Sequence, residues 1–288
     1  MPRVTKTWRQ ASWAISVLLA VAVLFLGIMR SRGFTDPNFH HSIVLSLIVA
    51  VIPVMIVDTM DYRWRKAIDK ELPRFLEGIA HAQLTGLPLL RAFREAGEGL
   101  SGPLKDEVRL MLAKISWGMS FEDALKLFME RVGTPLARRI ATLIIEANRA
   151  GGLVERIFTP LAQATATFQA MEEERKAQLK PYIFVTYISF FIFLAITYVL
   201  YTSFFVPMAG IPAVGGISPP SLRENWILLY HMGIVLGTFS GLIAGAIGEG
   251  RVYGGLKHVV IMLLATFMVF REMIEPGWFW ALLGFRRA

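Results

Sequence analysis

Long uncharged apolar runs alternate with one extended polar stretch along this chain. A helix needs about 20 apolar residues to cross the hydrocarbon core of a membrane, and four runs approach or exceed that length. They are Ala11–Met29, Phe39–Val57, Pro181–Val206 and Trp226–Gly248. A weaker fifth segment, 258–273, crosses only if its flanking basic side chains reach the membrane surface. The pattern predicts an all-α, polytopic membrane protein with about five transmembrane helices.

The polar stretch, residues 58–180, has the apolar spacing of helices. Its apolar residues recur three and four positions apart, and no part alternates as a strand would. Ser101, Thr134 and Ser120 are expected N-caps, the last in a capping box with Asp123. Short connections favour antiparallel neighbours, so we expect a six-helix bundle. The predicted helices are 66–84, 88–97, 103–116, 121–131, 135–149 and 153–180, the last of which runs into the third span.

Charge is concentrated in the same stretch. It holds 36 of the 52 charged residues in a chain that is 55% apolar and has a formal net charge of +8. About 120 residues can bury a core of their own. We therefore expect three parts: two transmembrane helices in 1–57, a helical domain in 58–180, and three further membrane segments in 181–288 with an interfacial aromatic tail.

Basic residues near the ends of the spans predict the orientation. With the N-terminus inside, eleven such residues lie on the inner side and six on the outer side, which the positive-inside rule favours. The first apolar run ends at Met29 and Arg30 without a small-residue cleavage site, so we interpret it as a retained span rather than a signal peptide. We expect a multi-pass protein of the cytoplasmic membrane, with the N-terminus and residues 58–180 in the cytoplasm.

The sequence lacks the familiar patterns of catalytic, metal and cofactor sites. It has no cysteine, which excludes disulfides and thiolate metal ligands. The phosphate-binding GxxxxGK[ST] pattern, GxSxG and HExxH are all missing, and no two of the five histidines are spaced four apart. We expect no enzymatic activity, no cofactor, no bound metal and no nucleic-acid partner.

Two glycine patterns stand out. The first is an internal repeat at an offset of 32, in which Gly86–Phe93 matches Gly118–Leu125; each copy predicts a helix, a glycine turn and a short helix. The second is a ribbon of small residues on the fourth span, where glycine recurs every fourth position and lets another helix approach closely. Its partner is either a span of the same chain or a second subunit or membrane-embedded client. The ribbon consists of Gly233, Gly237, Gly241 and Gly245.

The segment from Glu71 to about Tyr201 resembles the F domain of type II secretion and type IV pilus platform proteins. One motif begins at Gly118, another is Glu146-Ala-Asn-Arg-Ala-Gly-Gly-Leu153, and the charged helix Glu172–Lys180 leads into an aromatic span. Ala and Asn follow Glu146 where bacterial members usually have Gly-Glu, so the chain is more similar to archaeal pilus and archaellum platform proteins, the tight-adherence C-like branch. The motif residues are Gly118, Ser120, Ala124, Leu125, Gly151, Gly152 and Leu153.

This resemblance implies a non-enzymatic platform in the inner membrane. Such a protein couples a hexameric cytoplasmic secretion ATPase to the assembly of pilin-like subunits. The chain has one F domain where many relatives have two, so a dimer with itself or with a paralogous F-domain protein is expected. For the pilin or dimer contact, the glycine ribbon is the preferred candidate. Candidates for the ATPase contact are Arg91, Arg94, Glu95, Glu98, Arg138, Arg139, Glu146, Arg149 and Arg156.

Two other classes of protein make different predictions for the sequence. A transporter or channel subunit with a cytoplasmic helical domain should have polar residues lining its spans, and these are nearly absent. A membrane enzyme or signalling receptor should have a catalytic or phosphoacceptor constellation, and the sequence does not display one. For each candidate contact residue, a plain solvated helix face is the competing interpretation.

Overall fold

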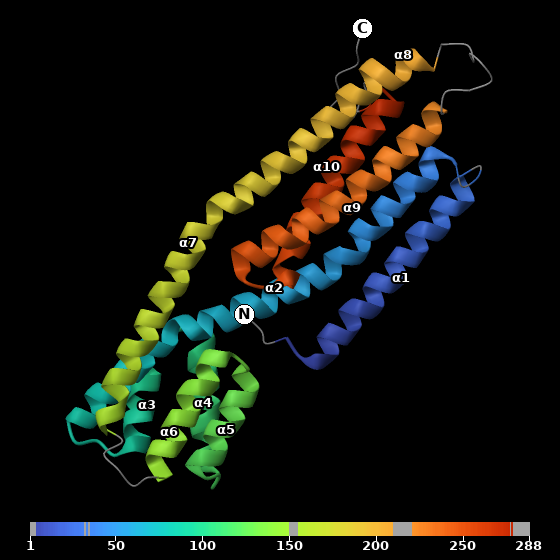
Figure 1. Cartoon of the computed structure of the whole chain (residues 1–288). Coiled ribbons are helices and arrows are strands. Elements are labelled where there is room, and N and C mark those ends of the chain that lie inside the picture. The colour runs from blue at the N-terminus through green and yellow to red at the C-terminus, as the bar shows by residue number, and fades with distance from the viewer. Residues whose placement is uncertain are drawn as a thin grey trace. The chain divides into compact units, whose positions relative to one another are not determined.

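The computed structural model describes residues 4–31, 33, 35–149, 155–209, 221–276 and 278. These ranges are helical and contain no strand (Figure 1). Five of the described helices are long and apolar enough to cross a membrane. The predicted fold class is therefore confirmed. The motif residues Gly151, Gly152 and Leu153, most of the third-to-fourth span loop and nearly all of the C-terminal tail lie outside the described residues.

The chain divides into two compact units. We call the first the polar unit; it comprises Thr59–Arg175 together with Met1–Val4. We call the second the apolar unit; it comprises Thr5–Asp58 and Lys176–Ala288. Two long helices, α2 (Pro37–Leu84) and α7 (Glu155–Leu200), contribute residues to both units.

The polar unit is built from the second part of α2, the first part of α7 and four shorter helices. The shorter helices are α3 (Leu89–Glu98), α4 (Gly102–Ser116), α5 (Phe121–Val132) and α6 (Pro135–Arg149). Phe93 of α3 is completely buried in their shared core. Its ring meets those of Phe75, Phe121 and Phe158 edge to face, at centroid distances of 5.5, 5.2 and 6.0 Å. Aromatic pairs prefer this geometry, so this cluster ties α2, α3, α5 and α7 together.

The two copies of the internal repeat form the same turn. Gly86 and Gly118 both have positive φ, +82° and +95°, a conformation that favours glycine. After each glycine the next residue donates its N–H to the carbonyl five positions back: Leu87 to Ala82 and Met119 to Lys114. This is the hydrogen bond of a Schellman motif, which ends helices at glycine.

All three expected N-cap residues directly precede a helix, and two of them form a capping hydrogen bond. The Ser120 hydroxyl accepts a hydrogen bond from the N–H of Asp123 at 3.1 Å, and that of Thr134 accepts one from Ala137 at 3.1 Å. Ser101 precedes α4, as expected, but its side chain makes no capping hydrogen bond.

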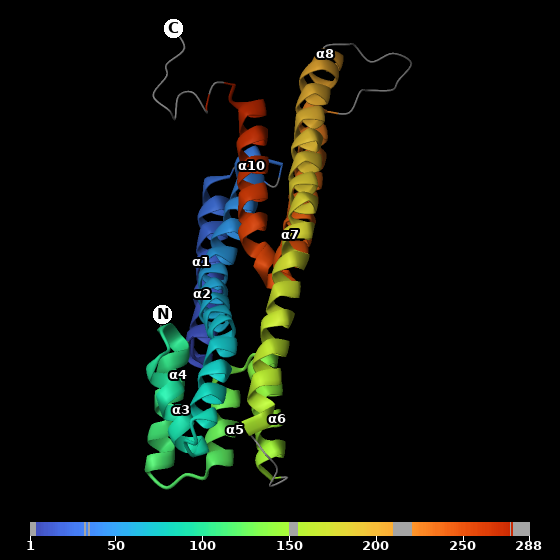
Figure 2. The ribbon, with the colours of Figure 1, turned by 90° about the vertical axis from the view of Figure 1, so that its left-hand side faces the viewer.

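The helix α2 is longer than the spacing of apolar residues predicted. The apolar pattern predicted a span ending at Val57 and a separate helix starting at residue 66, whereas α2 is unbroken from Pro37 to Leu84. Four of the eight residues between are charged, but none is glycine or proline, so nothing there ends the helix. The helix α7 continues into the third span, as predicted, and Figure 2 shows it as one uninterrupted helix.

The apolar unit contains α1 (Lys6–Arg30), the first part of α2, the second part of α7, α9 (Leu222–Glu249) and α10 (Leu256–Ile274). After α7 come a short π-helical turn, η1 (Tyr201–Phe205), and α8 (Val206–Met208); a 3-10 turn, η2 (Val252–Gly255), joins α9 to α10. Trp226, Tyr230 and Phe270 are buried between α9 and α10. At the C-terminal end of α10, Arg271 lies over the ring of Trp278, 4.4 Å from its centroid.

Candidate functional site

The charged residues proposed to contact an ATPase lie on two helices of the polar unit. The α3 set and the α6 set are exposed, whereas the side chain of Arg156 lies outside the described residues. The exposed members are Arg91, Arg94, Glu95 and Glu98 on α3, and Arg138, Arg139, Glu146 and Arg149 on α6. The amphipathic pattern of both helices explains this placement, because their apolar residues are in the core.

Two members of the α6 set already have partners. Arg149 Nη2 lies 2.9 Å from Glu122 Oε2 on α5, and Arg149 Nη1 lies 3.7 Å from Glu146 Oε1. The hydrogen bond from Arg149 lowers the pKa of the Glu122 carboxyl. Arg149 therefore joins α5 to α6. Sequence reasoning could not find this pair, because 27 positions separate its members.

Arg138 and Arg139 differ from Arg149 in this respect. Both are exposed on α6, and neither forms an ion pair with any residue that the structure describes. Leu143, half exposed, lies one turn further along the same helix. An arginine pair beside an apolar side chain is a typical composition for a protein interface. Of the predicted contact residues, these two arginines are the most available to an acidic partner.

Two large apolar side chains are exposed at the repeated turns, and the sequence analysis did not single them out. Leu84 at the end of α2 is 78% exposed, and Trp117 just after α4 is 82% exposed. Lys114 Nζ lies 5.9 Å from the Trp117 ring centroid. Tryptophan is enriched among residues that dominate binding energies. Their position next to the turn glycines, outside the apolar stripes, was a signal that the sequence contained.

Buried charge in the polar unit has a structural role. Glu107, 7% exposed, receives two hydrogen bonds from Arg131: Nε to Oε2 at 2.7 Å and Nη2 to Oε1 at 3.0 Å. The Thr134 hydroxyl donates to Asp69 Oδ1 at 2.6 Å. Burial raises the pKa of the Asp69 carboxyl to about 6, against the lowering effects of Thr134 and Arg65. Among the described residues, no group of three or more histidines and carboxylates is arranged to hold a metal ion.

The glycine ribbon of α9 packs against α10, η2 and α7 of the same chain. A β-carbon built on Gly233 would lie 2.9 Å from Thr266 Cγ2, and one on Gly241 would lie 2.5 Å from the backbone nitrogen of Val259. One on Gly245 would overlap the backbone of Gly255, and one on Gly237 would lie 3.2 Å from the ring of Phe190 on α7. The ribbon therefore serves helix packing within the chain, one of the two interpretations that the sequence allowed. A contact with a second subunit or a filament subunit stays a prediction.

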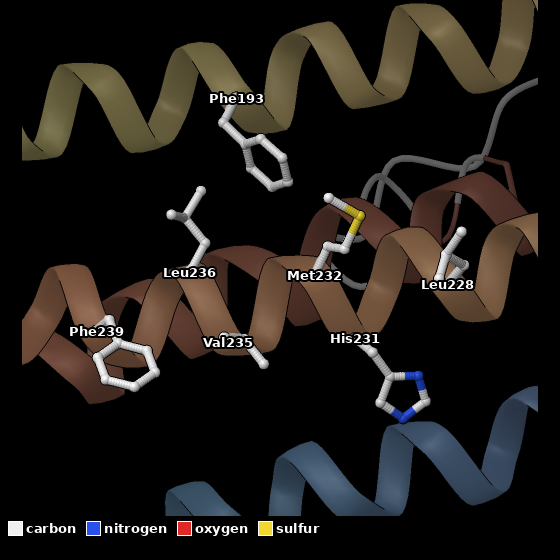
Figure 3. A pocket seen from close by; sticks show the side chains of 7 residues that line it. All are labelled: Phe193, Leu228, His231, Met232, Val235, Leu236 and Phe239. Atoms are coloured by element: carbon white, nitrogen blue, oxygen red, sulfur yellow. The ribbon is translucent and has the colours of Figure 1, made fainter.

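A groove runs along a different face of α9. It has a volume of about 630 Å³ and is apolar except for one histidine. In Figure 3, Phe193 points from α7 toward Leu236 and Met232 of α9. The ring of His231 donates from Nδ1 to the carbonyl of Ile227 at 2.8 Å, which leaves Nε2 as an acceptor in the neutral ring. The lining residues are Phe193, Leu228, His231, Met232, Val235, Leu236 and Phe239.

Polar pairs join the helices of the apolar unit at both ends. His41 Nδ1 of α2 lies 3.0 Å from the Tyr230 hydroxyl of α9, and His258 Nδ1 of α10 lies 2.7 Å from the Tyr187 hydroxyl of α7. At the α9–α10 turn, Arg251 pairs with Asp58 and Glu249, both at 3.1 Å. Such contacts satisfy polar groups that lipid would leave without partners.

These observations define the class: a polytopic helical membrane protein with one helical polar unit. Residues 75–202 match the model of the family described as Type II secretion system (T2SS), protein F. This match confirms the resemblance that the sequence motifs indicated, and residues 75–202 are therefore similar to protein F. The matched region begins in the last ten residues of α2 and ends at the second residue of η1.

One curated relative is archaeal, which is consistent with the archaeal branch that the motifs favoured. It is the uncharacterized protein MJ1286 of Methanocaldococcus jannaschii, 23% identical over 259 residues. The aligned region covers 89% of this chain but only 42% of the relative, so the chain spans less than half the length of that protein. No solved structure matches the chain.

Proposed function

We propose that this protein is the membrane platform of a type IV pilus-like or type II secretion machine, of the archaeal pilus or archaellum kind. The observation that carries the proposal is the match to protein F at residues 75–202 in a chain with five membrane-length helices. In this role the protein is not an enzyme; it passes movement from a separate motor to membrane-embedded subunits. The N-terminus and the polar unit are then cytoplasmic, as the distribution of basic residues favours.

The motor in this proposal is a hexameric cytoplasmic secretion ATPase. Its contact with the platform must be reversible, and charged surfaces favour rapid association and specificity. The charges of Arg138 and Arg139 are not compensated by any described residue, which makes them the preferred anchor for an acidic surface of the motor. Trp117 and Leu84 are apolar candidates for the same interface.

The filament subunits are proposed to be pilin-like proteins with an apolar helix. The groove between α7 and α9 is a better candidate for that helix than the glycine ribbon, because α10 covers the ribbon. Leu228 and Phe239, at opposite ends of the groove lining, are each 61% exposed. We also propose that the chain pairs with itself or with a paralogous F-domain protein.

Co-purification from native membranes tests the proposal. The full-length chain should bring down a hexameric ATPase and pilin-like subunits. The double variant Arg138→Glu with Arg139→Glu should lose the ATPase but keep its fold. Lys105→Glu with Arg109→Glu, an equal charge change at exposed positions on α4, should retain it. Membranes that yield neither partner, or solute conduction by the purified chain alone, would count against a platform.

A further inference from the structure

The exposed face of α2 just beyond its apolar segment carries a row of cations. Arg63, Lys66, Lys70 and Arg74 follow one another at spacings of three and four residues, and all four are exposed. Residues at these spacings lie on one face of a helix. We call this row the basic stripe.

The acidic residues of the same segment are placed elsewhere. Asp61 Oδ2 lies 2.9 Å from Arg65 Nε, and Asp69 accepts a hydrogen bond from Thr134. Glu71 is half buried. Between Arg63 and Arg74, α2 therefore exposes four cations and no carboxylate.

The basic stripe has no partner within the described part of the chain. None of its four members forms an ion pair there. The positive charges of the basic stripe are therefore available to another molecule. Because the residues stand on a continuous helix whose opposite face is packed in the core through Leu72, Phe75 and Leu76, the spacing of the charges is preorganised.

The length of the basic stripe argues against membrane lipid as its main ligand. At 1.5 Å per residue, Arg63 lies about 9 Å beyond Val57 along the helix, Lys66 about 14 Å, Lys70 about 20 Å and Arg74 about 26 Å. The headgroup layer is only about 5–7 Å thick on each side of the hydrocarbon core. Screening limits electrostatic reach to about 8 Å in physiological salt. Along the helix axis, the last two members therefore lie farther from Val57 than the headgroup layer and the screening length together extend.

The far end of the basic stripe opens into a groove between α2 and α3. This groove has a volume of about 570 Å³, and Arg74 is one of its lining residues. Its floor is made of small residues; a β-carbon built on Gly78 would lie 3.0 Å from Ala96 Cβ. Its charged rim carries both signs, with Arg74 and His81 alongside Glu77 and Glu95. An elongated partner that follows the stripe would therefore reach a concave surface at its end.

We propose that the basic stripe and the adjoining groove bind an acidic helical face of a partner protein on the cytoplasmic side. The partner presents carboxylates at helical spacing along Arg63–Arg74, and its end enters the groove. The inference goes beyond the proposed function, because it does not depend on the partner being the ATPase or on Arg138 and Arg139.

A synthetic probe tests the charge pattern with the full-length chain in nanodiscs of zwitterionic lipid. The probe is a labelled alanine-based helical peptide with four glutamates on one face, and its isomer carries the same glutamates distributed around the helix. Binding is measured by fluorescence anisotropy at low and at physiological salt. The stripe variant replaces Arg63, Lys66, Lys70 and Arg74 with Gln. The matched control replaces Lys105, Arg109, Lys126 and Arg175 with Gln, which removes the same charge from exposed positions outside the proposed ATPase contact.

The wild-type chain and the matched control should bind the one-face peptide alike and prefer it to the isomer. The stripe variant should bind it about tenfold more weakly, since several exposed ion pairs each contribute a fraction of a kcal/mol. Equal loss in both variants, or no preference between the peptides, would show a general charge effect and overturn the proposal.

A second measurement separates lipid from protein as the ligand. The natural chain has no cysteine, so Lys70→Cys and Arg63→Cys each provide a single site for a fluorescent label. In nanodiscs with anionic lipid and nitroxide-labelled headgroups, the label at position 63 should be quenched and the label at 70 should not. Equal quenching at both positions would mean that headgroups cover the basic stripe, and the proposal would be wrong.

Discussion

The packing of α9 on α10 predicts that three glycines of one helix respond differently to the same change. Alanine at Gly241 would place a β-carbon 2.5 Å from the nitrogen and 2.6 Å from the Cα of Val259. Alanine at Gly245 would overlap backbone atoms of Gly255. At Gly248 the nearest atom is the terminal Cδ1 of Ile183, at 2.8 Å, and that side chain can rotate away.

The expected magnitudes follow from these contacts. Relative to glycine, alanine favours a helix by up to about 1 kcal/mol. At Gly241 this gain is outweighed, because ordinary carbon contacts begin near 3.4 Å and the two backbones must separate by roughly 1 Å. A gap of that size removes a quarter to a half of the dispersion energy of each affected atom pair. We expect a net loss of about 1–3 kcal/mol for Gly241→Ala, at least as much for Gly245→Ala, and a small gain or no change for Gly248→Ala.

Thermal unfolding in detergent, followed by circular dichroism, measures these differences. Gly241→Ala and Gly245→Ala should lower the unfolding temperature by about 2–10 °C, whereas Gly248→Ala should leave it unchanged or raise it slightly. The opposite signs at positions on one helix distinguish backbone contact from any general effect of alanine. A Gly241→Ala protein as stable as the wild type would refute the argument that α9 and α10 touch through their backbones.

Two further predictions concern buried charge in the polar unit. Burial raises the pKa of Asp69 from 3.8 to about 6, so ionisation of this carboxyl lowers the stability of the fold progressively as the pH rises between these values. Above pH 6, Asp69→Asn should therefore be more stable than the wild type by about 1–3 kcal/mol, and near pH 4 the two proteins should be equally stable. Unfolding measured across pH checks both outcomes. Glu107→Leu leaves Arg131 without its carboxylate partner and should lower the free energy of unfolding by about 1–3 kcal/mol. The double variant with Arg131→Leu should recover most of this loss, because removing both charges leaves no unpaired buried charge. No recovery would contradict the pairing.

Features that depend on local spacing could be predicted from the sequence. The apolar stripes identified the helices of the polar unit because a helix exposes every third or fourth residue on one face. The caps at Ser120 and Thr134 and the turns at Gly86 and Gly118 were also predictable, since each depends on a few neighbouring residues. The extent of α2 was not predicted, because a change from apolar to charged residues marks the boundary between membrane and water and not the end of a helix.

Features that depend on which elements meet could not be predicted in the same way. The small-residue pattern of Gly233–Gly245 predicts a close helix contact, but a neighbour from the same chain or another would satisfy it equally. The pairs Glu107–Arg131 and Glu122–Arg149 join residues 24 and 27 positions apart, and no periodicity specifies them. The sequence did contain a sign that Glu107 is unusual, because this residue interrupts the apolar positions around Leu104, Val108 and Met111.

The close contact between α9 and α10 has a consequence for biogenesis. Because a tight turn joins these helices and each covers much of the other, their shared surface can form as soon as both have left the ribosome. Glu249 and its partners Arg251 and Lys257, whose Nζ lies 2.6 Å from Glu249 Oε1, hold the polar end of this hairpin. We therefore expect α9 and α10 to enter the bilayer together, already packed against each other, before the earlier helices pack around them.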